Sequence, residues 1–131
     1  MLDVVIVGGS SAGLSAALIL GRSLRDVVVI DDQKPCNRFS LASHGFLTRD
    51  GTPPSDLLKI AHEQLQFYPT VALKTATASN IEKTDFGFEI LSSHGTKLQT
   101  RTVLLATGLH DELPPLNGIE GLWGKSVAHE S

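Results

Sequence analysis

The sequence predicts an α/β fold with a parallel sheet, and three features of its first third support this. A continuous β-branched run, Val4 to Val7, is typical of a strand that is buried on both faces of a parallel sheet. Glycines and serines follow at once, and from Gly13 to about Leu20 apolar residues recur at helical spacing. A second apolar run, Val27 to Ile30, leads into two aspartates. The order of strand, tight turn, helix and strand is typical of a βαβ unit.

Composition bounds the class of protein. The 131 residues fit one domain, and 41% apolar with 19% charged residues is ordinary for a globular chain. The net charge of −3 gives no concentrated basic face, so we expect neither a nucleic-acid nor a membrane partner. The opening apolar run is too short for a spanning helix and lacks the basic start of a signal peptide. With one cysteine, Cys36, no internal disulfide can form, and a cytoplasmic location is expected.

A second helix is expected after an irregular stretch. Residues 35–51 carry no periodic pattern. Thr52 and Pro53 then offer a capping hydroxyl and a proline at the first helical position. An apolar face at helical spacing follows, and Pro69 is expected to close the segment.

After this helix the hydrophobic period falls to two. Phe86, Phe88 and Ile90 alternate with other residues, which predicts a strand whose stripe packs in the core. Residues 93–96 carry turn chemistry, and a further strand is expected beyond them. We therefore predict a three-stranded β-meander inserted between the Rossmann-type units. The last apolar run, Thr102 to Ala106, is expected to rejoin the parallel sheet.

The main motif is the GGSSAG stretch from Gly8 to Gly13. Its first glycine allows the tight strand-to-helix turn, and its last allows helix and strand to pack closely. Ser10 stands where G-x-G-x-x-G has its second glycine, and its hydroxyl could itself donate to a phosphate oxygen. The following helix start offers free N–H groups to an anion. The alternative is that these glycines only form a tight turn and bind no ligand.

Asp31 supports a dinucleotide, because it ends the second strand eighteen positions after Gly13. Its carboxylate can accept hydrogen bonds from ribose hydroxyls and would repel a 2′-phosphate, so NADP is disfavoured at this site. The alternative is an aspartate that is merely solvated at a strand end. The motif alone does not choose between FAD and NAD.

Four segments in order resemble the low-molecular-weight thioredoxin reductase-like flavoproteins, in particular the branch that includes dithiol oxidases. They are VIVGGSSAGLSAALILGRS, VVVIDDQKPCNR, SHGFLTRDGTPPSDLLKIAHEQL and LLATGLHDELPPLNGIEGLWGKSV. The resemblance implies that residues 1–131 form a single FAD-binding, Rossmann-like domain. It also implies a homodimer in which electrons pass from NAD(P)H through FAD to a Cys-x-x-Cys pair and a disulfide or dithiol substrate.

The resemblance also assigns cofactor-binding residues by position. It implies Gly8, Gly9, Ser10, Ser11, Ala12 and Gly13 at the FAD pyrophosphate, Asp31 and Asp32 at the adenosine ribose, Asn37 and Arg38 just beyond it, His44, Gly45 and Phe46 near the flavin end, Ala78 at the adenine, and Ala106, Thr107 and Gly108 at the last strand.

The departures from the family leave the function open. This chain contains no Cys-x-x-Cys, and it lacks the NADPH domain and the C-terminal FAD segment of the family. Cys36 has no resolving partner, and neither a catalytic residue nor a metal ligand can be named. One hypothesis is the FAD-binding domain of an oxidoreductase, with an NAD(P)H-binding or redox partner domain supplied elsewhere. The alternatives are a non-catalytic, truncated FAD-binding module and an NAD-binding domain without flavin.

Overall fold

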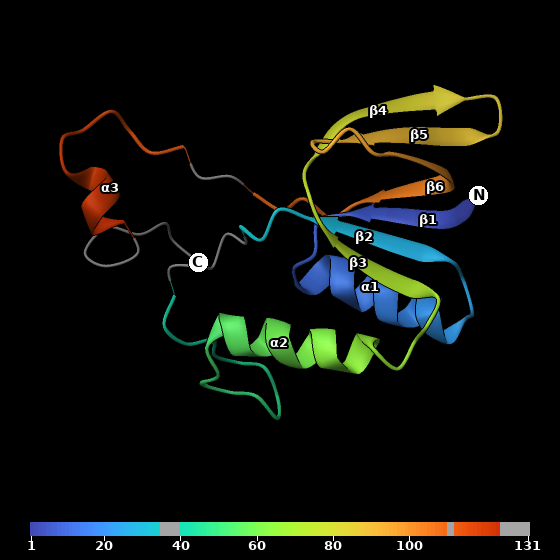
Figure 1. Cartoon of the computed structure of the whole chain (residues 1–131). Coiled ribbons are helices and arrows are strands. Elements are labelled where there is room, and N and C mark those ends of the chain that lie inside the picture. The colour runs from blue at the N-terminus through green and yellow to red at the C-terminus, as the bar shows by residue number, and fades with distance from the viewer. Residues whose placement is uncertain (35–39, 110–111, 124–131) are drawn as a thin grey trace.

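The structure is a computed structural model that describes residues 1–34, 40–109 and 112–123. Along the chain, the strands and helices alternate at first and are followed by a run of strands (Figure 1). The described elements are β1 (Leu2–Val7), α1 (Ser11–Arg22), β2 (Val27–Asp31), α2 (Pro54–Leu65), β3 (Val71–Thr75), β4 (Ala78–Thr84), β5 (Gly87–Ser92), β6 (Lys97–Leu105) and α3 (Ile119–Leu122).

All six described strands form one sheet in the order β3-β2-β1-β6-β5-β4. The four strands β3, β2, β1 and β6 are parallel, whereas β5 runs antiparallel to both β6 and β4. The helices α1 and α2 pack against each other on one side of this sheet (Figure 1). The predicted α/β fold with a parallel sheet and a meander is therefore confirmed.

The boundary of the last strand differs from the prediction. A third meander strand and a separate strand from Thr102 to Ala106 were expected, but β6 is one continuous strand that serves both purposes. Thr100 pairs with Leu2 of β1 on one side and with Phe88 of β5 on the other. The meander therefore extends the parallel sheet without a break.

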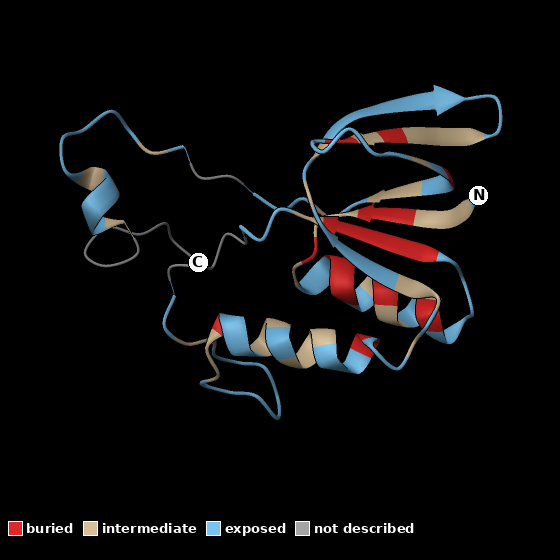
Figure 2. Ribbon diagram, viewed as in Figure 1, coloured by how far each residue is buried: buried red, intermediate tan, exposed pale blue. Residues whose placement is uncertain are grey.

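The core lies on both faces of β1 and β2, as Figure 2 shows by their buried colour. Alternate residues of a strand point to opposite faces. Ile6 accordingly packs with Leu14 and Ala17 of α1, whereas Val5 packs on the other face with Ile90 of β5. The continuous apolar runs of the sequence thus reflect strands that are buried on both faces.

Two local predictions need correction. The helix α2 begins at Pro54, with Pro53 at the N-cap and no capping side chain, while Thr52 instead pairs with Ser43 in an isolated β-bridge. Phe86 was expected in the core, but it lies in the β4–β5 turn and is 80% exposed. Within the described part of the chain, none of the helices is both long and apolar enough to cross a membrane.

Candidate functional site

A groove of about 390 Å³ lies where β1, β2 and β6 end. These strand ends form the edge of the sheet away from the N-terminus (Figure 1). In open parallel sheets this carboxyl edge is where ligands bind. The groove collects residues from four separate parts of the chain, namely Val7 to Ala12, Ile30 to Asp32 with Lys34, Ala76 to Ala78, and Ala106 to Leu109.

Gly8 makes the turn that opens this groove. Its φ of +109° is a conformation that L side chains rarely adopt. A Cβ at this position would lie 2.1 Å from the carbonyl oxygen of Ala106. The Gly8 N–H donates to the carbonyl oxygen of Ile30 at 2.8 Å, so the ends of the three strands are held together here.

Gly13 acts from behind the groove and does not line it. It is buried in the first turn of α1, and a Cβ there would lie 1.8 Å from the carbonyl oxygen of Gly8. The absence of a side chain therefore lets α1 start directly against the end of β1. This is the packing role that the sequence motif predicts.

The start of α1 presents free polar groups to the groove. The Leu14 N–H donates to the Ser10 carbonyl oxygen at 2.9 Å, and the N–H groups of the preceding turn have no intrahelical partner. Ser10 is the N-cap, but its hydroxyl makes no capping hydrogen bond. Backbone donors, the helix dipole and this hydroxyl together suit a phosphate.

Asp31 is fixed by the glycine loop. Its Oδ1 accepts a hydrogen bond from the Gly9 N–H at 3.1 Å, and a Cβ on Gly9 would lie 2.7 Å from the Asp31 Cβ. The Ala76 N–H donates to the Asp31 carbonyl oxygen at 2.9 Å, and this hydrogen bond holds the segment before β4 beside the end of β2. The second carboxylate oxygen of Asp31 can therefore accept hydrogen bonds from a ligand.

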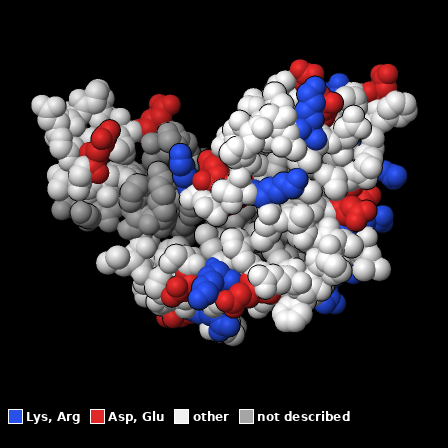
Figure 3. Space-filling view, in the orientation of Figure 1, with Lys and Arg blue, Asp and Glu red and all other residues white. Residues whose placement is uncertain are grey.

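Charge in and around the groove is mixed. Among the described lining residues, Lys34 is the single basic one, beside Asp31 and Asp32. Lys and Arg side chains also lie among Asp and Glu side chains over the face shown in Figure 3. The structure therefore supplies donors for an anion mainly from the backbone of the glycine loop.

The family model described as pyridine nucleotide-disulphide oxidoreductase matches residues 2–130. The chain belongs to this family. Thioredoxin reductase aclD of Aspergillus oryzae is 38% identical over 132 residues, and the match covers 98% of this chain and 42% of that protein.

Two crystal structures extend the comparison with the pyridine nucleotide-disulphide oxidoreductases. An oxidoreductase from Agrobacterium tumefaciens matches with a TM-score of 0.90 and 39% identity, covering 98% of this chain and 43% of its own. HlmI matches with a TM-score of 0.91 and 37% identity, covering 98% of this chain and 41% of its own. The chain thus spans about two-fifths of the length of these relatives.

Thioredoxin reductases of this family depend on FAD, and the part that this chain matches is their Rossmann-like FAD-binding domain. The predicted family and cofactor are therefore confirmed. The geometry of the groove suits the pyrophosphate and the ribose that FAD contains. A pyrophosphate would meet the first turn of α1 and the uncommitted hydroxyl of Ser10, and a ribose would meet Asp31.

Most residues predicted at the cofactor line this one groove. They are Gly8, Gly9, Ser10, Ser11, Ala12, Asp31, Asp32, Ala78, Ala106, Thr107 and Gly108. Their individual roles toward FAD stay predictions.

The residues predicted near the flavin end lie apart from the groove. His44, Gly45 and Phe46 belong to the exposed loop before α2, and Phe46 lines a second hollow between α1 and α2. Their flavin role stays a prediction. Asn37 and Arg38, like Cys36, lie outside the described residues.

The sequence reasoning missed several lining residues. Lys34 was not among the residues predicted at the cofactor, but it is exposed and borders the groove. Ala76 and Thr77 line the groove because they follow β3, which pairs with β2. No local sequence pattern predicts this pairing. Within residues 1–34, 40–109 and 112–123, no cluster of His, Cys, Asp and Glu is suited to a metal ion.

Proposed function

We propose that this chain serves as the FAD-binding part of an oxidoreductase that transfers electrons from NAD(P)H to a disulfide or dithiol substrate. The observation that carries the proposal is the groove itself. It combines a glycine-lined helix start with Asp31 at one sheet edge in a thioredoxin reductase-like domain. When bound, FAD supplies the two-electron chemistry, and the protein supplies binding and orientation.

The chain's own residues would hold the cofactor in an extended pose. Backbone N–H groups from Ser10 onward and the Ser10 hydroxyl would bind the pyrophosphate, and Asp31 would bind the adenosine ribose. Ala78 would present backbone to the adenine. The turn after β6, from Ala106 to Gly108, would close the opposite wall.

The remaining parts of the reaction would come from outside residues 1–131. The single cysteine of the chain, Cys36, provides no Cys-x-x-Cys pair. The proposal therefore includes a dithiol and an NAD(P)H site on a partner domain or on a longer form of the protein. The share of about two-fifths of each relative's length supports this arrangement.

Spectroscopy tests the binding part of the proposal. We expect the purified protein to be yellow and to release FAD, but no FMN, on denaturation. A colourless protein that binds NAD and takes up no FAD would contradict it and would support the NAD-binding alternative.

Anaerobic reduction separates the enzyme from the second candidate, a non-catalytic FAD-binding module. The absence of a Cys-x-x-Cys pair favours that candidate for the chain taken alone. Bleaching of the flavin by NADPH would support an enzyme. An oxidised spectrum that persists under NADPH, but bleaches once a partner carrying a pyridine-nucleotide domain is added, would support a split reductase.

We also propose a homodimer in the cytoplasm. The hollow between α1 and α2 has an apolar lining that includes Leu14, Leu57 and Phe46, and Phe46 is 60% exposed. Apolar surface of this kind supports association of two copies. Light scattering on the eluting protein tests the dimer, and a monomer at all concentrations would contradict it.

A further inference from the structure

The 43–52 loop, between β2 and α2, is closed at its base by backbone hydrogen bonds. Ser43 and Thr52 form an isolated antiparallel bridge, in which the Ser43 N–H donates to the Thr52 carbonyl oxygen at 2.8 Å. The Gly51 N–H donates back to the Ser43 carbonyl oxygen at 2.7 Å. Compact loops whose ends are close in this way often carry function.

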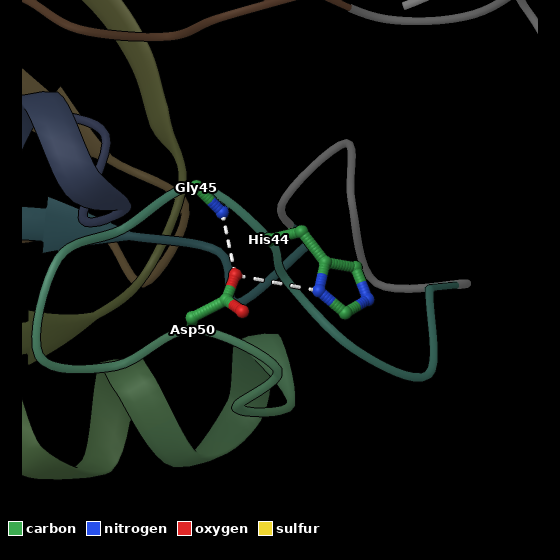
Figure 4. A network of polar contacts seen from close by, with 3 residues as sticks. All are labelled: His44, Gly45 and Asp50. Carbon is green, nitrogen blue, oxygen red and sulfur yellow. Dashed lines mark hydrogen bonds and ion pairs between the residues drawn. The ribbon is translucent and has the colours of Figure 1, made fainter.

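One carboxylate joins the two sides of this loop. Asp50 Oδ1 accepts a hydrogen bond from the Gly45 N–H at 2.8 Å and lies 3.4 Å from Nδ1 of His44 (Figure 4). The same oxygen thus contacts both residues that precede Phe46. Figure 4 shows the imidazole ring of His44 beside this carboxylate.

The backbone of the loop needs such a restraint. Gly45, Thr48 and Gly51 all have positive φ, at +86°, +78° and +78°. For the β-branched Thr48 this conformation is a real outlier, and it persists only where surrounding contacts impose it. Conformational strain of this kind is concentrated at functional sites.

The loop lines a second hollow, which shares one residue with the cofactor groove. Phe46, Thr48 and Arg49 line the hollow between α1 and α2, whose volume is about 300 Å³. Ser11, at the start of α1, lines both that hollow and the cofactor groove. The loop and the helix start that faces the cofactor groove therefore line the same hollow.

We propose that Asp50 is a positioning residue of the cofactor site, which fixes the conformation of the 43–52 loop and the orientation of the His44 ring. The inference rests on the proposed function and on the prediction, implied by the family resemblance, that His44 and Gly45 lie toward the flavin end of FAD. Asp50 itself was not among the residues predicted from the sequence. It acts through its neighbours and needs no contact with the cofactor.

The ionisation of Asp50 agrees with this role. The Gly45 N–H holds the pKa of Asp50 below its ordinary value, partial desolvation opposes this effect, and His44 adds to the lowering. Because the folded pKa is lowered, the contribution of the carboxylate to the loop is complete above the ordinary carboxylate pKa of about 4. It is lost as the pH falls through the lowered pKa. His44 and Arg49 are the other charged or titratable side chains of the loop.

Two variants and a control test the proposal in the full chain. Asp50→Ala removes both contacts, whereas Asp50→Asn keeps an oxygen for the Gly45 N–H and loses the charge beside His44. Asp85→Asn, an exposed aspartate in the β4–β5 turn, is the matched control. The readouts are the Kd for FAD, the visible circular dichroism of the bound flavin, and its midpoint potential.

We expect Asp50→Ala to weaken FAD binding by about fivefold or more, the effect of one lost hydrogen bond, and to alter the flavin dichroism. Asp50→Asn should retain most of the affinity but shift the midpoint potential or its pH dependence, and Asp85→Asn should match the wild type. An Asp50→Ala protein with wild-type Kd, dichroism and potential would overturn the proposal. A stability loss without any flavin change in either Asp50 variant would overturn it as well.

A measurement without cofactor distinguishes this proposal from the proposed function. In the wild type, the amide proton shift of Gly45 should titrate with the lowered pKa of Asp50, and the titration should vanish in Asp50→Ala. A wild-type chain that binds no FAD would contradict the proposed function, whatever the Gly45 titration shows. FAD binding with no Gly45 titration would contradict the positioning role alone.

Discussion

At the scale of single residues, Gly13 lies where α1 packs directly against the turn that follows β1. A Cβ at this position would lie 1.8 Å from the Gly8 carbonyl oxygen, which is backbone and cannot turn away. We expect Gly13→Ala to destabilise the fold by on the order of 1–3 kcal/mol, the usual cost of overpacking, and to reduce FAD binding more than tenfold, a loss above about 1.4 kcal/mol. Urea unfolding and flavin content measure the two effects. Gly121→Ala in α3 is the control, because a Cβ there meets nothing within 4 Å.

A substitution at Asp31 tests how much the carboxylate charge contributes to FAD binding at the same site. Its Oδ1 is held by the Gly9 N–H, so Asp31→Asn should keep the shape of the turn while removing the charge. A hydrogen bond to a charged group contributes about 1.5–3 kcal/mol, so we expect FAD affinity to fall by roughly 10- to 100-fold with little change in unfolding. Fluorescence titration gives the Kd. An unchanged Kd would mean that the carboxylate does not contact the ribose.

At the scale of elements, the meander is tied to the parallel strands through Ile90. This β5 side chain is fully buried with Val5 and Val28, so truncation leaves a cavity in the shared core. Ile90→Ala should cost about 2–5 kcal/mol in thermal or urea unfolding. Phe86→Ala, at an 80% exposed position four residues earlier, should change stability by less than about 0.5 kcal/mol. Equal losses in the two variants would contradict this assignment of the core.

The elements that the sequence predicted correctly are those with local signals. The β1 run, the glycine turn and α1 follow one another without a gap, and each is set by neighbours in sequence. The full extent of β6 has no such signal. Its first half pairs with β5 and its second half with β1, and a partner 98 residues away, as between Leu2 and Thr100, leaves no local pattern. The prediction that Phe86 is buried was wrong for a related reason. The alternation of apolar residues that marks β5 continues back into the β4–β5 turn, where the side chains are no longer buried.

At the scale of the whole molecule, the groove combines residues that a local sequence pattern predicts with residues that only the pairing of distant strands brings there. Gly8 and Asp31 were predictable, since a glycine turn and an acidic strand end have fixed spacing in a βαβ unit. Ala76 and Lys34 were not predictable. Ala76 reaches the groove because β3 pairs with β2, and Lys34 reaches it through the path that the chain takes after the end of β2. The sequence shows Asp50 only as an aspartate between Gly45 and Gly51, and its contact with His44 depends on the positive φ that both glycines adopt in the folded loop.

The cofactor's identity should appear in the stability of the whole domain. A ligand that binds only the folded state at 100 times its Kd adds about 2.7 kcal/mol to the free energy of unfolding. For a domain of this size, 1 kcal/mol raises Tm by about 3 to 5 °C, so saturating FAD should raise Tm by roughly 10 °C. All six described strands belong to one sheet whose edge forms the groove, so we expect the domain to unfold in one cooperative transition that shifts when the ligand binds. NAD should raise Tm far less, and FAD should lose most of its effect in Asp31→Asn. Scanning calorimetry measures both shifts. A larger rise in Tm with NAD than with FAD would contradict the assignment of the groove to FAD.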